Sequence, residues 1–98
     1  MLRIVTTDIF DSWLADLSDS RARVKVLARI DRLERGNPGD VAPVGEGVSE
    51  MKINYGPGYR VYFVQRGRTV IVLLCGGTKQ RQAADIIHAK ALARLWKD

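Results

Sequence analysis

Apolar and polar residues alternate most regularly within residues 46–74, where three short runs are separated by turns that contain glycine. The runs cover residues 48–55, 59–65 and 69–75, with Gly56-Pro57-Gly58 and Arg66-Gly67-Arg68 between them. Val, Ile, Tyr and Phe fill the runs, and these residue types favour strands. The pattern therefore predicts a meander of antiparallel strands.

Neighbouring side chains of a strand point to opposite sides of a sheet, so the first two runs divide into two faces. One face is apolar and holds Met51, Ile53, Tyr55, Tyr59, Val61 and Phe63, whereas the other holds Glu50, Lys52, Asn54, Arg60, Tyr62 and Val64. A three-residue loop that pairs Tyr55 with Tyr59 would place Asn54 opposite Arg60 and Lys52 opposite Tyr62. Taken alone, the polar face fits a solvated outer surface as well as it fits a functional site.

A first helix is predicted directly after residues 2–5, a short apolar run that can add a strand to the sheet. Thr7 or Asp8 can cap this helix, because both side chains carry an oxygen that accepts from free backbone N–H groups. Its expected core positions recur at helical spacing and are Phe10, Trp13, Leu14 and Leu17.

Ser18-Asp19-Ser20 interrupts that pattern and can cap a second helix over residues 21–35, which ends at Gly36. Its apolar positions are Val26, Leu27, Ile30 and Leu33, and its basic positions are Arg21, Lys25, Arg29 and Arg32. The basic positions could bind a phosphate backbone, but a solvated face is the favoured interpretation. The two helices are expected to form a hairpin that covers the apolar sheet face, with residues 37–43 as a loop.

A third helix is predicted over residues 79–96, after a turn at Gly76-Gly77-Thr78, with Ala84, Ile87, Ala91 and Leu95 as its apolar positions. Lys79 and Arg81 lie in its expected first turn, where the helix dipole disfavours cations. Violations of local rules are more frequent at functional sites, and two cations beside free N–H groups could bind phosphate. Alternatively, both side chains point to solvent and are neutralised by Asp85.

The 98 residues predict a single domain over residues 1–98 with a formal net charge of +5. Lysine and arginine balance aspartate and glutamate in residues 1–45, so the whole excess lies in residues 46–98. This excess indicates a polyanionic partner, either nucleic acid or an acidic protein segment. The lone Cys75 lies in an apolar run, which favours a buried thiol in a cytoplasmic protein, and no run approaches the roughly 18 apolar residues of a membrane span.

Lys52, Arg60, Lys79 and Arg81 could surround one groove. RNA cleavage needs a base for the ribose 2′-hydroxyl, cations for the scissile phosphate and an acid for the leaving oxygen. Arg60 and Lys79 are candidate phosphate clamps. Lys52, crowded by other cations, could lose its proton and act as the base, and Glu50 is the alternative.

Tyr62 could position a base or a ribose, and Arg66 and Arg68 are further candidates for RNA binding. His88 is the only histidine and lies mid-helix without a cysteine or histidine at ligand spacing, so a structural role is expected for it. We therefore expect neither a metal site nor a cofactor.

The segments EMKINYGPGYRVYF and LLCGGTKQRQAADI closely resemble the RelE/ParE superfamily of bacterial toxins, and within it the HigB-like addiction-module killer proteins. The resemblance covers nearly the whole chain. It implies an α+β fold of order β-α-α-β-β-β-α, with an antiparallel-rich sheet and a helical hairpin packed on one face. It also implies a cognate antitoxin of the helix-turn-helix, HigA-like type. The toxin would then contact DNA only indirectly, through its complex with this antitoxin.

RelE-like members of the superfamily cut mRNA on the ribosome without a metal. By position, the resemblance implies that Arg60 contacts the scissile phosphate and that Lys52, Lys79 and Arg81 contribute. The better-known nucleases carry a Tyr or His near the C-terminus, whereas this chain has no Tyr after Leu74. The general acid is therefore unassigned, and a ParE-like inhibitor of DNA gyrase without nuclease activity is the alternative.

Overall fold

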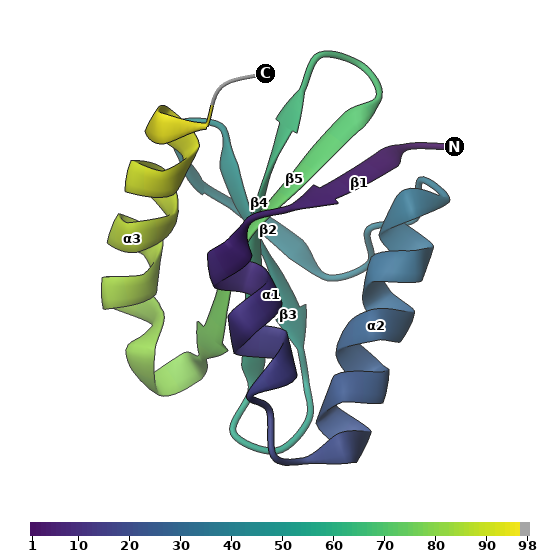
Figure 1. The fold of residues 1–98 in the computed structure, drawn as a ribbon, viewed down its shortest axis with the longest axis vertical. Helices are drawn as coiled ribbons and strands as arrows, with labels where there is room; N and C mark the ends of the chain where they lie inside the picture. Colours follow the sequence, from purple (N-terminus) through teal and green to yellow (C-terminus); the bar gives the residue numbers. More distant parts are fainter. Residues whose placement is uncertain (97–98) are drawn as a thin grey trace.

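The computed structural model describes residues 1–96, which form one five-stranded sheet and three α-helices (Figure 1). In chain order the elements are β1 (Arg3–Thr6), α1 (Asp8–Ala15), α2 (Ser20–Glu34), β2 (Val41–Gly45), β3 (Val48–Ile53), β4 (Tyr59–Arg66), β5 (Val70–Thr78), a 3₁₀ turn (Lys79–Arg81) and α3 (Gln82–Leu95). The strand order is β1-β5-β4-β3-β2, with β1 parallel to β5 and every other pair antiparallel. The predicted α+β class is confirmed.

Strand β2 begins at Val41 and replaces the last three residues of the loop that was expected at residues 37–43, so the sheet has one strand more than the predicted order. Pro43 lies within β2 and hides the strand from a sequence pattern, because proline cannot donate to a ladder. The proline is tolerated in this strand because β2 forms an edge of the sheet. Residues 76–78 were also expected to form a turn, but they continue β5 as far as Thr78.

The β3–β4 register differs from the prediction by two residues. Ile53 lies opposite Tyr59, and Lys52 lies opposite Arg60, so Asn54 faces no partner in β4. The connecting loop has five residues instead of three, and its Gly56 and Gly58 adopt left-handed φ values of 55° and 81°. Because the shift is an even number, each side chain stays on its predicted face.

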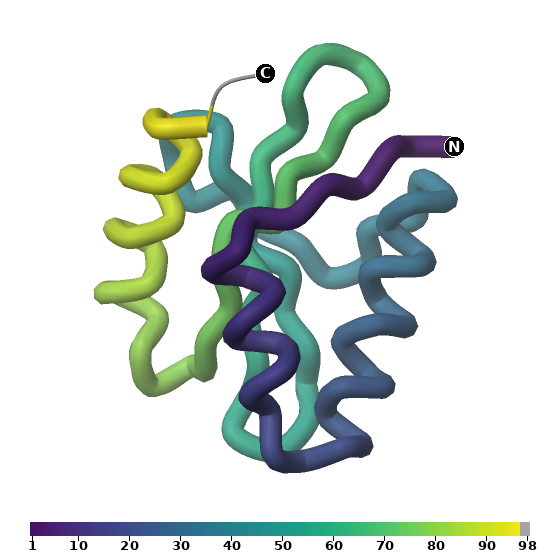
Figure 2. Tube along the Cα trace, in the orientation of Figure 1, coloured from purple at the N-terminus to yellow at the C-terminus, as the bar shows by residue number. Residues whose placement is uncertain are grey.

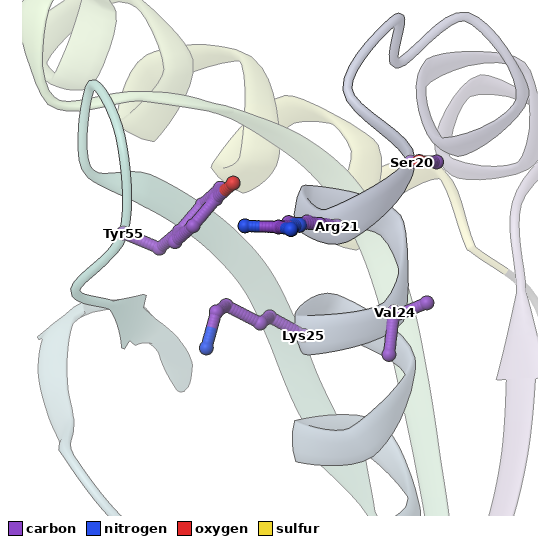
Figure 3. Close-up of a pocket in the computed structure, with 5 residues that line it drawn as sticks. All are labelled: Ser20, Arg21, Val24, Lys25 and Tyr55. Carbon is purple, nitrogen blue, oxygen red and sulfur yellow. The ribbon is translucent and has the colours of Figure 1, made fainter.

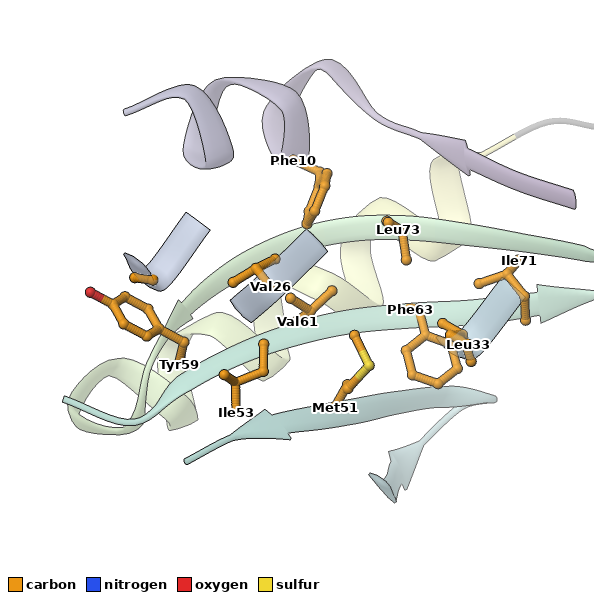
Figure 4. Packing of buried hydrophobic residues seen from close by; sticks show 11 residues of the cluster. Phe10, Val26, Leu33, Met51, Ile53, Tyr59, Val61, Phe63, Ile71 and Leu73 are labelled. Atoms are coloured by element: carbon orange, nitrogen blue, oxygen red, sulfur yellow. The ribbon is translucent and has the colours of Figure 1, made fainter. Parts of the chain in front are cut away.

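Helices α1 and α2 pack over the apolar sheet face, as predicted (Figure 4). Phe10, Val26 and Leu33 from the helices lie over strand residues that include Val61 and Leu73. Thr7 caps α1 by accepting from the Phe10 N–H at 3.0 Å, and Asp19 caps α2. Leu27 was expected in this core, but its side chain is 48% exposed because it lies on the outer side of α2.

Helix α3 covers the opposite face, with Ala89 and Ala93 packed among the buried side chains of Val64, Val72 and Leu74. The predicted apolar face of this helix was wrong, because Ile87 and Leu95 are 70% and 74% exposed. The small side chains of Ala89 and Ala93 let the helix approach the sheet closely. Within residues 1–96, no helix is long and apolar enough to cross a membrane.

The β3–β4 loop and the α1–α2 connection lie at the same end of the molecule, the lower end in Figure 2. A hydrogen bond of 3.1 Å from the Tyr55 hydroxyl to Asp19 Oδ2 joins them. Tyr55, which lies outside the β3–β4 ladder, thus connects the longer loop to the start of α2.

Candidate functional site

The polar residues of the β3–β4 hairpin meet beneath the first turn of α3. Lys52 pairs with Arg60 across the two strands, and Glu50 pairs with Tyr62. Only 3% of Glu50 and 9% of Arg60 is exposed, and Tyr62 is fully buried. A solvated outer face, which the sequence left open, is therefore wrong for Glu50, Arg60 and Tyr62, whereas the Lys52 side chain remains 37% exposed.

Glu50 is the centre of this cluster. Both of its carboxylate oxygens accept from the Gln82 side-chain amide, at distances of 3.0 and 2.8 Å. Lys52 Nζ and Arg60 Nε each lie 3.9 Å from a Glu50 oxygen. A buried carboxylate is costly unless it is paired and hydrogen-bonded, and these three neighbours supply both kinds of compensation. The Glu50 carboxylate thus lies beside Lys52, which the sequence analysis had described as crowded by other cations.

Arg60 is held in place but keeps unused binding capacity. Its Nη1 donates to the carbonyl oxygen of the preceding residue, Tyr59, at 3.3 Å. Its Nε is buried and has no hydrogen-bond partner. Leaving a charged donor unsatisfied is unfavourable, so an anion that reaches this nitrogen would be bound favourably.

Lys79 lies next to Gly58, as does Arg60. Its backbone N–H donates to Gly58 O at 2.7 Å, which ties the 3₁₀ turn to the β3–β4 loop. A Cβ placed on Gly58 would lie 3.4 Å from Lys79 Cβ and 3.5 Å from Arg60 Nη1. Lys79 from the 3₁₀ turn and Arg60 from β4 therefore flank the same side of Gly58, and the exposed Lys79 side chain can reach the same anion as Arg60.

Arg81 does not join this group as closely. It lies in the 3₁₀ turn, before the first turn of α3, and its Nε is 3.9 Å from Asp85 Oδ1. Its side chain is 72% exposed. The alternative that Asp85 neutralises a cation here fits Arg81.

Asp85, Tyr62 and Cys75 form a second buried layer between α3 and the sheet. Asp85 Oδ2 and the Tyr62 hydroxyl have no hydrogen-bond partner. Burial raises the pKa of Asp85 above its ordinary value, although Arg81 and His88 oppose that shift. Burial, and then the charges of Glu50 and Asp85, raise the pKa of Tyr62 as well. The same causes, burial and Asp85, raise the pKa of Cys75 to about 12, so it is a protonated core thiol, in agreement with the prediction.

The sequence of this chain matches the family described as "phage derived protein Gp49-like (DUF891)" over residues 12–95. The chain belongs to the Gp49-like family. An uncharacterized protein of Haemophilus influenzae is 47% identical to it over 93 residues, which cover 95% of this chain and 94% of the relative. The Gp49-like family is a RelE-like, toxin-type family of toxin–antitoxin systems, so the resemblance to these toxins holds at that level.

Two of the RNA-binding candidates of this Gp49-like protein lie away from the cluster. Arg66 is six residues beyond Arg60 along β4, which corresponds to about 20 Å, and its Nη2 donates to Ala93 O at 2.6 Å. Arg68 lies in the β4–β5 turn at that same end. His88, for which a structural role was expected, is exposed on α3 and contributes nothing to the core.

Gln82 of the Gp49-like site was not predicted from the sequence, and Asp85 was predicted only as a partner that neutralises Lys79 and Arg81. Both point from α3 onto the polar face of the sheet, and only the packing of the helix makes this visible. The sequence did contain one indication of this close packing, the glycine pair Gly76-Gly77. In the structure, a Cβ on Gly77 would lie 1.9 Å from Asp85 Oδ2. Paired glycines in a strand indicate a close approach of another element. Within residues 1–96, no group of three or more His, Cys, Asp or Glu side chains could hold a metal ion.

Proposed function

We propose that this Gp49-like protein is the HigB-like toxin of a type II toxin–antitoxin system and that it cleaves mRNA on the ribosome without a metal ion. The observation that carries the proposal is the buried Arg60 guanidinium, whose Nε has no partner and lies 3.9 Å from the Glu50 carboxylate. A guanidinium held in this way is already oriented to bind a phosphate. Lys79, which lies beside Gly58 like Arg60, would add a second cation to the same anion.

The reaction would be the attack of a ribose 2′-oxygen on the neighbouring phosphorus. Glu50 would accept the 2′-hydroxyl proton, Arg60 and Lys79 would stabilise the charge on the phosphate, and the bond to the 5′-oxygen would break. The Lys52 ammonium lies 3.9 Å from Glu50 and is the neighbouring group that could give a proton to the leaving oxygen. The products would be a 2′,3′-cyclic phosphate and a 5′-hydroxyl. Lys52 as the base is the alternative assignment.

Access to Glu50 sets a condition on this mechanism. Gln82 donates to both oxygens of Glu50, and only 3% of Glu50 is exposed. The Gln82 amide would therefore have to turn aside before Glu50 can take a proton. Tyr62 is fully buried and would act from beneath the site, by packing, rather than by touching RNA.

The decisive experiment is cleavage mapping. A defined mRNA is incubated with the purified protein, once alone and once on translating ribosomes, and the cut positions are read by primer extension. We expect cuts only on the ribosome and their loss in Arg60→Ala. Arg35→Ala, which removes an exposed arginine from the end of α2, is the matched control and should cut like the wild type.

No cuts under either condition would refute the nuclease proposal. A supercoiling assay with DNA gyrase would then test the ParE-like alternative, in which the chain acts by binding. Cuts that persist in Arg60→Ala would instead refute the role of this arginine.

We further propose a cognate helix-turn-helix, HigA-like antitoxin as the partner, with ribosome and mRNA as the targets. The excess of positive charge in residues 46–98 supports an acidic or amphipathic partner segment over or beside the Arg60 cluster. Co-expression with the proposed helix-turn-helix antitoxin should yield a complex that survives purification. A complex whose structure leaves the Arg60 cluster fully open would contradict neutralisation by direct cover.

A further inference from the structure

A second site lies at the same end of the molecule, between the N-terminal turns of α2 and the β3–β4 loop. It is a surface pocket of about 520 Å³ lined by Ser20, Arg21, Val24, Lys25 and Tyr55 (Figure 3). This volume lies within the range of pockets that hold small ligands. None of these residues contributes to the Glu50–Arg60 cluster.

The pocket combines an oriented aromatic ring with two cations. The Tyr55 hydroxyl donates to Asp19 Oδ2 at 3.1 Å, which holds the ring in place. The guanidinium of Arg21 extends toward that ring from α2 (Figure 3), and Lys25 Nζ lies 5.2 Å from the ring centroid. Asp19 adds one negative charge, but its oxygens already accept from the α2 backbone and from Tyr55.

We propose that this pocket binds one unpaired nucleotide of a single-stranded RNA, with its base stacked on Tyr55 and its phosphate bound by Arg21 and Lys25. The entering base would take the place of the Lys25 ammonium above the ring and leave that ammonium free for the phosphate. Base–aromatic stacking next to cations is the general way in which proteins bind single strands. A ring that is already oriented loses little conformational freedom when a base stacks on it.

The position of Tyr55 links this pocket to the proposed cleavage site, and the inference rests on that proposed RNA substrate. Gly58 N–H donates to Tyr55 O at 3.0 Å, Gly58 O accepts from the Lys79 N–H at 2.7 Å, and a Cβ on Gly58 would lie 3.5 Å from Arg60 Nη1. The β3–β4 loop therefore carries the ring on one side and the phosphate-binding cations on the other. An RNA strand bound at Arg60 would reach Tyr55 by passing around the tip of this loop, which assigns the pocket a role in positioning the RNA.

The test measures binding of a 12-nucleotide single-stranded RNA that carries 2′-O-methyl groups, so that it cannot be cleaved, by fluorescence anisotropy. Tyr55→Leu should weaken binding about tenfold or more, the loss expected for one base–aromatic stack. Tyr55→Phe keeps the ring and removes only the hydrogen bond to Asp19, so it should bind within about twofold of the wild type. Arg21→Gln and Lys25→Gln should each lower the slope of log K against log salt by about 0.7.

Arg35→Gln is the control for charge, because Arg35 is exposed and lies about 21 Å along α2 from Arg21. An equal decrease of the salt slope in Arg35→Gln would show diffuse attraction and overturn the pocket. Wild-type affinity in Tyr55→Leu, or no binding by the wild type, would also overturn it. Tighter binding of a 12-residue polyglutamate peptide that competes with the RNA would assign the surface to an acidic protein segment instead.

Tyr55 also packs against the core, so a second measurement covers the case in which Tyr55→Leu fails to fold. Adenosine 5′-monophosphate titrated into the wild type should shift the NMR signals of the Tyr55 ring and of Arg21. Shifts elsewhere, or none, would overturn the proposal. Failure of the cleavage experiment with intact RNA binding would refute the nuclease function alone, which separates the two inferences.

Discussion

Gly77 is the position at which a single methyl group should separate α3 from the sheet. Gly77 pairs with Arg60 across β4 and β5, and a Cβ at this position would lie 1.9 Å from Asp85 Oδ2 and 2.9 Å from Asp85 Cγ. Because carbon and oxygen atoms normally stay about 3.3 Å apart, Gly77→Ala forces the carboxyl to move by more than ~1 Å. Asp85 is buried on α3, so the displacement reaches the turn that holds Gln82 over Glu50.

The magnitude follows from two opposing effects. Overpacking of a core costs about 1–3 kcal/mol, and a Gly→Ala exchange recovers about 0.4–1 kcal/mol by restricting the unfolded chain. The left-handed region is not involved at Gly77, so no backbone strain is added. We expect Gly77→Ala to lower the free energy of unfolding by about 1–2 kcal/mol, which corresponds to roughly 4–16 °C in Tm for a domain of this size. Urea unfolding followed by circular dichroism measures the change.

A double-mutant cycle isolates the contact. In an Asp85→Ala background the added methyl group meets no carboxyl, so Gly77→Ala should be neutral or stabilising by about 0.5 kcal/mol. Gly76→Ala is the matched control, because its Cβ would lie 2.3 Å from the Trp13 ring on the opposite sheet face and should destabilise equally in both backgrounds. An equal cost of Gly77→Ala with and without Asp85, or no cost at all, would refute the reasoning.

Three further predictions concern stability. Burial raises the pKa of Asp85 in the folded state, so the free-energy cost of burying its charged form is absent at acid pH and grows as pH rises through the folded pKa. Asp85→Asn should therefore raise the free energy of unfolding more at pH 7 than at pH 4. An equal gain at both pH values would contradict this. Gln82→Leu removes the amide that bonds Glu50 and should cost about 1–3 kcal/mol in urea unfolding, whereas an unchanged midpoint would show that the cations suffice. Thr7→Val loses the cap of α1 and the hydrogen bond to Leu74 O, which should lower the free energy of unfolding by about 1–2 kcal/mol. Because 1 kcal/mol corresponds to about 4–8 °C in Tm, a Tm within about 2 °C of the wild type would argue against this prediction.

The sequence determined the faces of the sheet and the starts of α1 and α2, because both depend on local geometry. The predicted register was wrong by two residues, but an even shift leaves each side chain on its predicted face. Met51 and Val61 therefore face the core under α1 and α2, and Glu50 and Arg60 face the other side. Thr7 and Asp19 cap α1 and α2 as predicted, since a cap needs only one side-chain oxygen beside free N–H groups.

The sequence also selected most of the residues of the site. Glu50, Lys52, Arg60 and Tyr62 share one face by alternation alone, and Lys79 follows the last strand. It misplaced Arg66 and Arg68, because a sequence pattern does not show how far apart two cations on one strand lie. The pocket at Tyr55 was not predicted from the sequence either, because it depends on the contact of Tyr55 with Asp19, which lies far away in the chain.

Tertiary structure alone decided which side of α3 is buried and what that burial does to the site. The helix presents no single strongly apolar side, and its orientation follows from close contact, where Ala89, Ala93 and Gly77 leave room. That contact sets Asp85 into the sheet, brings Gln82 over Glu50 and removes Arg60 from water. Periodicity records which residues share a face, but burial and ion pairing depend on what packs against that face, and segments far apart in the chain decide it.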